Sequence, residues 1–453
     1  MKFGKICLTA AAVSAALMSA SSFAAAGPTD FFGYMRAGVG VSGANGGQTQ
    51  YEKNNVGRLG NENDVYGEIG IGKDVFQEDD LKFRVNSMIA VTSNGSNDWE
   101  GTEGDDAQFA LRQFNVESQG ILNFAPEATL WAGKRYYQRH DIHITDRYYW
   151  DISGAGAGVE NIEVGPGKLA VAWVRSDNSG DFNSAGAADG PNDQSINVNI
   201  VDVRYAGINL WSGAQLELGL DYAITNPTSS QNDLNTNNGL MFTAEMTQSL
   251  LGGFNKTVVQ FGTEGYAAPM VYGGAGSWYG VADKDDASAY RLINHGVISL
   301  NERWDISHQL LWASTMNDLD KTQDGDVTNF SAVIRPEFKW DAHHKTIFEA
   351  GYYNNDSGDI ESTKQVANTG THDADDDWVP AEYTTETAQD SSGQKFTLAQ
   401  AWSAGDSFWA RPEFRLYASY LMDNDNANAF KGGDFKAGDA TEWNFGIQVE
   451  AWW

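Results

Sequence analysis

The C-terminal stretch Glu442-Trp-Asn-Phe-Gly-Ile-Gln-Val-Glu-Ala-Trp-Trp453 alternates between apolar and polar side chains. Its odd-numbered positions hold Trp443, Phe445, Ile447, Val449, Ala451 and Trp453, and its even-numbered positions hold Glu442, Asn444, Gly446, Gln448, Glu450 and Trp452. Successive side chains of a β-strand point to opposite faces of the sheet. The stretch is therefore predicted to be a strand with one apolar face and one polar face that ends in Trp452.

The same period of two occurs in other short windows along the chain. It is clear in residues 31–39, 65–71, 216–222 and 411–420, where apolar residues at every second position face polar ones. Beyond the N-terminal region, no window holds the 18 or so consecutive apolar residues that a membrane-spanning helix needs. The chain is therefore predicted to be all-β.

Long polar stretches rich in Asn, Asp, Gly, Ser and Thr separate these windows. They cover residues 43–57, 92–107, 176–195, 225–238, 264–288, 314–327, 354–393 and 423–441. Short connections, such as Asn301–Arg303 and Asp341–His343, alternate with them. Short turns at one end and long loops at the other are typical of an outer-membrane β-barrel, and the length allows about 16 to 18 strands.

A secreted β-sandwich or propeller would also alternate. In those folds the apolar face packs on another sheet and is mostly bulky and aliphatic. Here that face is rich in Gly, Ala and aromatic residues, as expected for a surface in contact with lipid. We therefore expect a transmembrane antiparallel barrel.

Composition excludes several other classes of protein. Of 453 residues, 61 are Asp or Glu and 30 are Lys or Arg, which gives a net charge of −31. A general nucleic-acid binder needs a basic surface, so no nucleic-acid partner is expected. The one cysteine, Cys7, excludes an internal disulfide and a cysteine-based zinc site.

The N-terminal residues have the three parts of a secretory signal. Lys2 and Lys5 precede the apolar run Ile6–Met18, and the small residues of Ser19–Ala26 follow it. The apolar run is too short to span about 30 Å of hydrocarbon. We expect residues 1–25 to be a removed signal peptide and residues 26–453 to form one barrel.

Several aromatic residues share the parity of the polar face: Tyr34, Tyr66, Phe254, Trp409 and Trp452. A ring on the water-filled side of a barrel gains nothing from lipid. Sugar rings stack on aromatic planes, and ionic or amide groups beside them bond the hydroxyls. A row of such weak sites lets a sugar chain enter, slide and leave. The parity therefore predicts a sugar-conducting lumen.

The stretch Lys134-Arg-Tyr-Tyr-Gln-Arg-His-Asp-Ile-His-Ile-Thr-Asp-Arg-Tyr-Tyr-Trp150 is too charged for a strand in contact with lipid. We interpret it as a loop folded into the pore, whose width is set by Arg139, Asp141, His143, Asp146 and Tyr148.

Metal and catalytic interpretations of this stretch are disfavoured. His140, Asp141, His143 and Asp146 match no standard set of metal ligands, and a glycosidase pair of Asp141 and Asp146 is less favoured still. Asp320–Asp326 resembles part of a calcium loop but lacks the closing Glu, so a solvated acidic loop is favoured. We expect no catalytic residue, metal or cofactor.

Sequence blocks along the whole chain carry a family resemblance. They are Asp30-Phe-Phe-Gly-Tyr-Met-Arg36, Arg58-Leu-Gly-Asn-Glu62, Asn97-Asp-Trp-Glu100, Trp131-Ala-Gly-Lys-Arg-Tyr-Tyr-Gln-Arg-His-Asp-Ile-His143, Tyr148-Tyr-Trp-Asp-Ile-Ser-Gly154, Phe242-Thr-Ala-Glu245, Gly253-Phe-Asn-Lys256, Ala404-Gly-Asp-Ser-Phe-Trp409 and Glu450-Ala-Trp-Trp453. With these blocks the chain resembles the maltoporins, the sugar-selective porins of Gram-negative outer membranes. The resemblance implies eighteen strands, a homotrimer in outer-membrane lipid, and facilitated diffusion of maltose and maltooligosaccharides without enzymatic activity.

The resemblance also implies which residues bind the sugar. The aromatic path would consist of Tyr34, Tyr66, Phe254, Trp409 and Trp452, with Trp99 contributed by a neighbouring subunit and Tyr148 opposite the path. The polar tracks would be Arg36, Arg58, Glu68, Arg112, Arg139, Asp141, His143 and Asp146. Parity alone says nothing about Trp99 and is ambiguous around Arg112.

Three departures from the family pattern stand out. Well-known members carry a cysteine pair near the first long loop, which this mature chain lacks. Arg147 adds an unexpected charge beside the predicted constriction. Loops 225–238, 264–288 and 354–393 fit the family poorly, so sugar length preference and a phage-receptor role stay open. A general or sucrose porin, and a secreted soluble carbohydrate-binding protein, remain as alternatives.

Overall fold

The computed structural model describes most of the mature chain. Described in full are residues 28–102, 107–176, 196–229, 237–272, 286–319, 325–358, 390–424, 430 and 440–453, together with the backbone of 361–367, 371–372, 378–379, 382–387 and 431–433. The predicted signal peptide and most of the acidic stretch Asp320–Asp326 lie outside the described residues.

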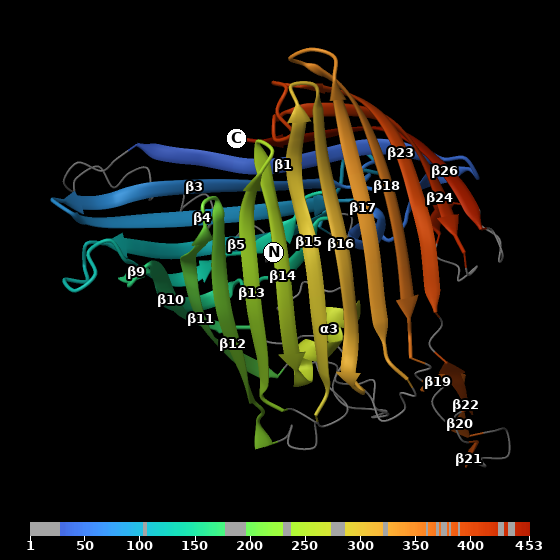
Figure 1. Ribbon diagram of the computed structural model, residues 1–453. Coiled ribbons are helices and arrows are strands. Elements are labelled where there is room, and N and C mark those ends of the chain that lie inside the picture. Colours follow the sequence, from blue (N-terminus) through green and yellow to red (C-terminus); the bar gives the residue numbers. More distant parts are fainter. Residues whose placement is uncertain are drawn as a thin grey trace.

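Eighteen of the strands in the described residues form a closed antiparallel barrel, as predicted (Figure 1). They are β1 (Thr29–Ser42), β3 (Val65–Glu78), β4 (Leu81–Ser93), β5 (Ala107–Gln119), β6 (Thr129–Arg135), β9 (Gly154–Val164), β10 (Gly167–Arg175), β11 (Asn197–Trp211), β12 (Ala214–Asn226), β13 (Gly239–Leu250), β14 (Gly253–Thr263), β15 (Ser288–Asn301), β16 (Trp304–Asn317), β17 (Thr328–Lys339), β18 (His344–Asp356), β23 (Ser391–Ser403), β24 (Glu413–Asp423) and β26 (Thr441–Trp452). Each strand pairs with its neighbours in the chain, and β1 pairs with both β3 and β26, which closes the barrel.

The two faces of the strands follow the alternation predicted from the sequence. On β26 the side chains of Trp443, Phe445 and Ile447 are exposed on the outside, whereas Gln448 and Glu450 are 1% exposed and point inward. On β1, Phe31 and Val39 are likewise exposed on the outside. The apolar residues therefore form the outer surface of a single closed sheet.

The connections differ in length between the two ends of the barrel. Short turns join β3 to β4, β9 to β10, β11 to β12 and β13 to β14 at one end. Gly213 (φ 84°) and Gly252 (φ 73°) lie in two of these turns, where positive φ favours glycine. The predicted long loops join strands at the other end, but the first extends over residues 43–64 rather than 43–57.

Shorter elements lie within the long loops. The first long loop, residues 43–64, contains β2 (Gly46–Gln50) and α2 (Lys53–Val56). The inward loop, residues 136–153, contains β7 (His140–Ile142) and β8 (Arg147–Trp150). The loop after β14 contains η2 (Glu264–Tyr266) and α3 (Ala267–Tyr272), and the other short strands are β19 (Glu361–Ala367), β20 (Thr371–His372), β21 (Trp378–Val379), β22 (Glu382–Thr387) and β25 (Lys431–Gly433). None of the helices in the described residues is long and apolar enough to cross a membrane.

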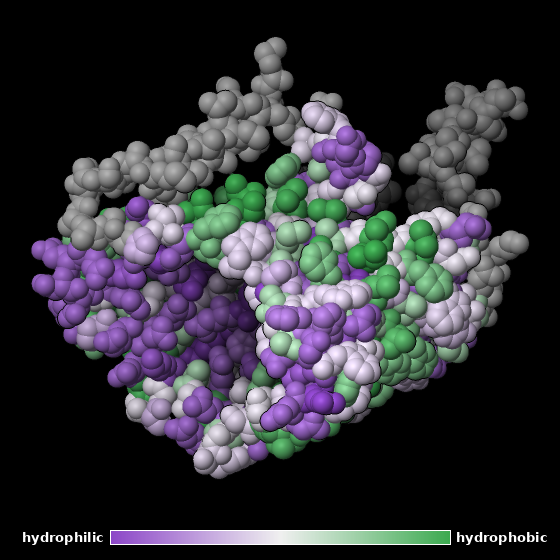
Figure 2. All heavy atoms as spheres, turned by 90° about the horizontal axis from the view of Figure 1, so that it is seen from above, coloured by the Kyte–Doolittle hydropathy of each residue, from purple (hydrophilic) through white to green (hydrophobic). Residues whose placement is uncertain are grey.

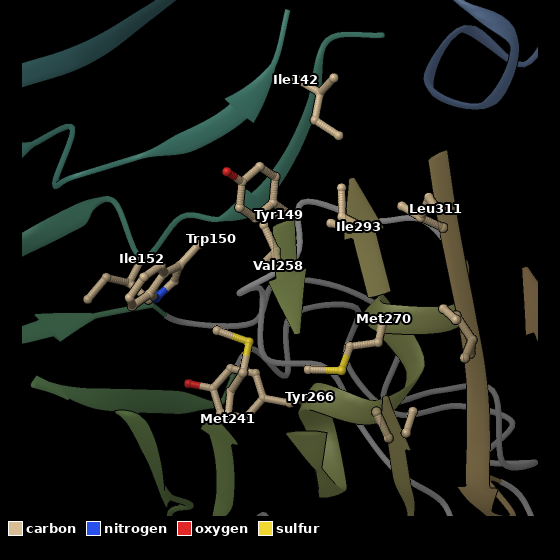
Figure 3. Close-up of a cluster of buried hydrophobic side chains, with 14 of the residues drawn as sticks. Ile142, Tyr149, Trp150, Ile152, Met241, Val258, Tyr266, Met270, Ile293 and Leu311 are labelled. Carbon is tan, nitrogen blue, oxygen red and sulfur yellow. The ribbon is translucent and has the colours of Figure 1, made fainter. Parts of the chain in front are cut away.

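The inward loop packs against the inner wall of the barrel. Ile142, Tyr149 and Trp150 are at most 2% exposed and belong to one apolar cluster with residues that point inward from β13 to β16. Figure 3 shows Tyr149 between Ile142 of the loop and Val258 and Ile293 of the wall. The barrel thus has an apolar core on one side of its interior, which narrows the remaining space.

The rest of the interior is polar. Seen from above, the molecule has a hollow whose walls are hydrophilic, while hydrophobic residues gather outside it (Figure 2). The folded chain therefore encloses a water-accessible lumen inside an apolar exterior.

Candidate functional site in the lumen

Three of the predicted aromatic residues lie on adjacent strands and form a row. Tyr66 is on β3, Tyr34 on β1 and Trp452 on β26. The ring centroids of Tyr34 and Tyr66 are 6.0 Å apart, and Tyr34 is the register partner of Trp452. The hydroxyl of Tyr34 donates to the inward-pointing Glu450 at 3.0 Å, which places this row inside the barrel.

His143 of the inward loop joins Trp409 to this row. Its ring centroid lies 5.2 Å from that of Trp409 and 5.8 Å from that of Trp452. Trp409 was placed on the polar face by strand alternation, and this reason was wrong. Residues 404–412 connect β23 to β24, so Trp409 does not lie on a strand. Its place beside Trp452 depends on the fold of this connection and not on strand alternation.

Phe254 and Trp99 lie apart from the row. Phe254 on β14 is 6.3 Å, ring to ring, from His295 and packs against the apolar cluster beneath the inward loop. Trp99 follows β4 and is 85% exposed in a single chain. Among the described residues no ring contact links either of them to Tyr34 or Trp452.

One ionic network surrounds the row and includes Arg36, Arg58 and Asp146. Arg58 contacts Glu450 at 3.0 Å and Glu62 at 2.8 Å, and Arg36 contacts Glu62 at 3.2 Å. Asp146 accepts from Lys53 at 2.6 Å and lies 3.6 Å from Arg36.

Glu62 is the acidic centre of this network. It belongs to the first long loop and is 3% exposed. Burial alone would raise the pKa of Glu62, but Arg58, Arg36 and Lys53 outweigh burial and lower it to about 2. Glu62 is therefore ionised at neutral pH, and the network places ion pairs beside the rings.

A second network connects Glu68, Arg112 and Arg139 through Tyr136. The hydroxyl of Tyr136 donates to Glu68 at 2.5 Å and accepts from Nε of Arg112. The guanidinium of Arg139 lies 3.4 Å from the centroid of the Tyr136 ring and 4.9 Å from that of Tyr148. Tyr148 and Asp141 are register partners in the small β7–β8 hairpin. Two of the five predicted constriction residues, Arg139 and Tyr148, thus lie around Tyr136, which sequence reasoning missed. His143 lies instead beside Trp409 and Trp452, and Asp146 belongs to the first network.

Both loops are held from below by a buried ionic group of the barrel wall. Glu349 accepts from Arg335 and from Lys395, each at 2.6 Å. Glu349 also accepts from the backbone N–H of Leu59 in the first long loop, at 3.0 Å. Arg335 donates to the backbone oxygen of Ile144 in the inward loop, at 3.2 Å. This wall group therefore anchors the first long loop without a disulfide.

The sequence held weak signals for the residues that were missed. Glu450 lies on the polar face of the last strand, and Tyr136 belongs to the densest cluster of rings and charges. No alternation in the sequence pointed to Glu62, because it lies in a loop. Arg147 is 1% exposed and packs against α2, so it is not a pore-lining charge.

The grouping with metal-ligand chemistry in the described residues is His140, Glu217 and Glu245. It differs from the set considered from the sequence. Glu245 already accepts from His140, Tyr149 and Lys256, at 2.8, 2.7 and 2.6 Å. These donors make the group an internal ionic network that joins the inward loop to the wall.

Comparisons with known proteins identify the family of the chain. The model of the family described as LamB porin matches residues 29–453. The chain is 46% identical to a protein named maltoporin from Photobacterium profundum, over 94% of this chain and 93% of that protein. It is 43% identical to maltoporin 1 of Klebsiella pneumoniae, over 98% of each. Among solved structures, the chain is similar to OccK2 (OpdF) of Pseudomonas aeruginosa, with a TM-score of 0.49 and 11% identity over 94% of this chain and 98% of that one. The family assignment does not depend on this weaker similarity. On the strength of the match over residues 29–453 and of the maltoporin relatives, the chain belongs to the LamB porin family.

Proposed function

We propose that the protein is an outer-membrane porin that lets maltose and maltodextrins diffuse along its lumen. The single observation that carries the proposal is the row of Tyr66, Tyr34 and Trp452, which lies beside the salt-bridge network of Arg36, Arg58 and Glu450. The maltoporin relatives support the same substrate class.

The chemistry of a glucan explains why a row of rings lies beside charged groups. The C–H faces of glucose units stack on aromatic planes, and each contact contributes about 1 kcal/mol if it resembles an aromatic pair. Carboxylates and guanidiniums beside the rings bond the hydroxyl groups at the edge of each sugar. Because each contact is weak and the next is close, the sugar can move down its gradient. The protein is a channel, and we propose no catalytic or cofactor role for its residues.

We assign the sugar contacts to the residues named from the sequence. Tyr34, Tyr66, Trp409 and Trp452 would form the central path, and Phe254 would extend it. Arg36, Arg58, Glu68, Arg112, Arg139, Asp141, His143 and Asp146 would bond sugar hydroxyls, and Tyr148 would face the path. Trp99, exposed in the single chain, would reach the lumen of a neighbour in a homotrimer.

The test is a sugar-titrated conductance measurement on the purified protein in planar bilayers. We expect maltohexaose to block the ionic current at lower concentration than maltose, because a longer glucan covers more rings. Conductance that maltohexaose fails to block would overturn the proposal. Equal half-blocking concentrations for sucrose and maltotriose would instead favour a general or sucrose porin of the same fold, and a soluble protein without conductance would favour the secreted alternative.

Three further assignments accompany this function. We propose that residues 1–25 are removed on export, which mass spectrometry of the mature protein would test. Cross-linking in outer membranes would test the homotrimer. The long loops opposite the short turns would face the outside, so a phage-receptor role would be tested by phage adsorption to cells that carry loop deletions.

A further inference from the structure

Among the residues that the structure describes, two buried arginines have no carboxylate partner at salt-bridge distance. Arg147 on β8 is 1% exposed and Arg291 on β15 is 0% exposed. The other buried arginines of the described residues pair with acids: Arg58 with Glu450, Arg204 with Asp202, Arg335 with Glu349, and Arg415 with Glu413 and Glu450. Removing a charge from water is unfavourable unless a partner offsets it. Arg147 and Arg291 therefore stand out as uncompensated cations.

Neutral acceptors bond only some of the N–H groups of each guanidinium. Arg147 donates from Nε to the backbone oxygen of Asn54 at 3.2 Å and from Nη2 to Asn55 Oδ1 at 2.5 Å. Arg291 donates from Nε and Nη2 to Gln260 Oε1 at 3.0 and 2.6 Å, and from Nη2 to the backbone oxygen of Tyr149 at 3.0 Å. In both residues Nη1 is buried, and no acceptor in the part of the chain that the structure describes bonds it.

The two arginines lie in the same part of the interior. Arg291 bonds the backbone of Tyr149, which is two residues beyond Arg147 on β8. Their positive charges are near enough to repel each other. Glu52 is within electrostatic range of Arg147, but its carboxylate accepts from Asn55 at 2.7 Å.

Deprotonation does not remove the buried positive charge of Arg147 at neutral pH. Burial lowers the pKa of Arg147 to about 10, so this guanidinium is still protonated at neutral pH. In the described part of the chain, two cations carry unbonded N–H groups and have no acid at hydrogen-bond distance, a combination that suits a negative ligand. Residues of α2, β14 and the inward loop bond the two guanidiniums, and both arginines are at most 1% exposed, so only a small ligand fits beside them.

We propose that a small monovalent anion of the halide class, chloride in the cell, binds between the guanidiniums of Arg147 and Arg291 behind the inward loop. The anion bonds the two Nη1 groups and offsets the mutual repulsion. It thereby ties the first long loop, the inward loop and the barrel wall together at the back of the pore. The site is separate from the proposed sugar path and does not depend on it.

Crystals of the full-length mature protein grown with sodium bromide test the proposal directly. We expect an anomalous bromide peak within hydrogen-bond distance of Nη1 of both arginines, and none there in Arg147→Leu. A water molecule without anomalous signal at that place would overturn the proposal. Bromide found on the outer surface but not between these two arginines would be an adventitious ion only, and this result would also overturn the proposal.

Thermal unfolding in detergent gives a second test that needs no crystal. At constant ionic strength, replacing chloride with gluconate should lower the unfolding temperature of the wild-type protein, because a ligand of the folded state stabilises it. Arg147→Leu and Arg291→Met should lose this chloride dependence. Arg204→Met is the matched control, because Arg204 is equally buried but pairs with Asp202 at 2.9 Å; it should retain the dependence. Chloride dependence that is unchanged in both test variants, or absent from the wild type, would overturn the proposal. If a variant fails to assemble, the bromide experiment on the wild type still decides.

Discussion

Tyr34 and Trp452 are opposite each other where the first strand of the barrel pairs with the last. Directly opposed residues of antiparallel strands have Cβ atoms about 4.5–5.5 Å apart, so their side chains are neighbours. On the other side of β1, Arg36 is the register partner of Tyr66, and its guanidinium lies 5.0 Å from the Tyr66 ring centroid. The pairing that closes the barrel therefore also assembles the aromatic row from residues more than 400 positions apart.

Removing one ring of this row should weaken sugar binding more than it changes the open pore. We expect Trp452→Ala to raise the half-blocking concentration of maltohexaose by roughly 2- to 12-fold, the equivalent of about 0.5–1.5 kcal/mol for one stacking contact. Single-channel recordings with increasing sugar measure this change.

Trp443 offers a matched control on the same strand. It is 48% exposed on the outer face, where no sugar in the lumen can reach it. Trp443→Ala should leave the half-blocking concentration unchanged. If both variants weaken the block equally, the effect is one of barrel stability and the assignment of Trp452 to the path is wrong.

Most of the barrel could be predicted because its physical cause is local. A strand between lipid and water must alternate, and the windows at 31–39 and 442–453 do so over their whole length. The polar loops between strands are equally visible, since nothing buries them. The inward loop was recognised because residues 134–150 are too charged to face lipid.

The finer parts of the site depend on contacts between distant segments. Trp409 reaches Trp452 through His143, three residues from three separate elements. Glu62 and Lys53 act from the first long loop, whose path into the lumen has no periodic signature. Tyr136 has its role only because Glu68 and Arg112 approach it from β3 and β5. No pattern along the sequence contains these relationships.

Tyr136 should act through both its ring and its hydroxyl. Tyr136→Phe removes the bridge between Glu68 and Arg112 but keeps the ring beneath Arg139. Tyr136→Ala removes both, so Arg139 and Arg112 lose their fixed positions. We expect maltotriose block to weaken in Tyr136→Phe and to weaken further in Tyr136→Ala, which bilayer titration measures. Equal sugar affinity in all three proteins would show that Tyr136 does not position the polar track.

Glu349 should be essential for the loops to stay docked. Glu349→Gln leaves the buried cations of Arg335 and Lys395 without a negative partner, which costs about 3–5 kcal/mol when a buried pair is broken. We expect a lower unfolding temperature and larger current fluctuations in the open pore, because the Leu59 N–H loses its charged acceptor and Arg335, which bonds Ile144, loses the carboxylate that positions it. Calorimetry and current-noise analysis measure the two effects.

The exposed Glu127 in the turn between β5 and β6 provides the comparison for this variant. Glu127→Gln removes the same charge from the chain but no buried partner, so both measurements should match the wild type. If Glu349→Gln has the unfolding temperature and the current noise of the wild type, the wall group does not anchor the loops.

The first long loop should loosen from the barrel wall in acid, over a pH range that Glu62 sets, because Glu62 bonds Arg36 on β1 and Gln448 on β26. The pKa of Glu62 is about 2 in the folded protein, below its ordinary value of 4.5. Below pH 4.5 Glu62 is protonated in the unfolded chain but still ionised in the folded one. The free energy of unfolding therefore falls as pH decreases. The contribution is fully present above pH 4.5, amounts to about 3 kcal/mol, and is lost as pH approaches 2. Unfolding temperatures measured from pH 6 to pH 2 should therefore fall more steeply for the wild type than for Glu62→Gln, which lacks the titrating group. Parallel curves for the two proteins would show that Glu62 does not hold the loop, and that Lys53 and Arg58 are balanced by Asp146 and Glu450 alone.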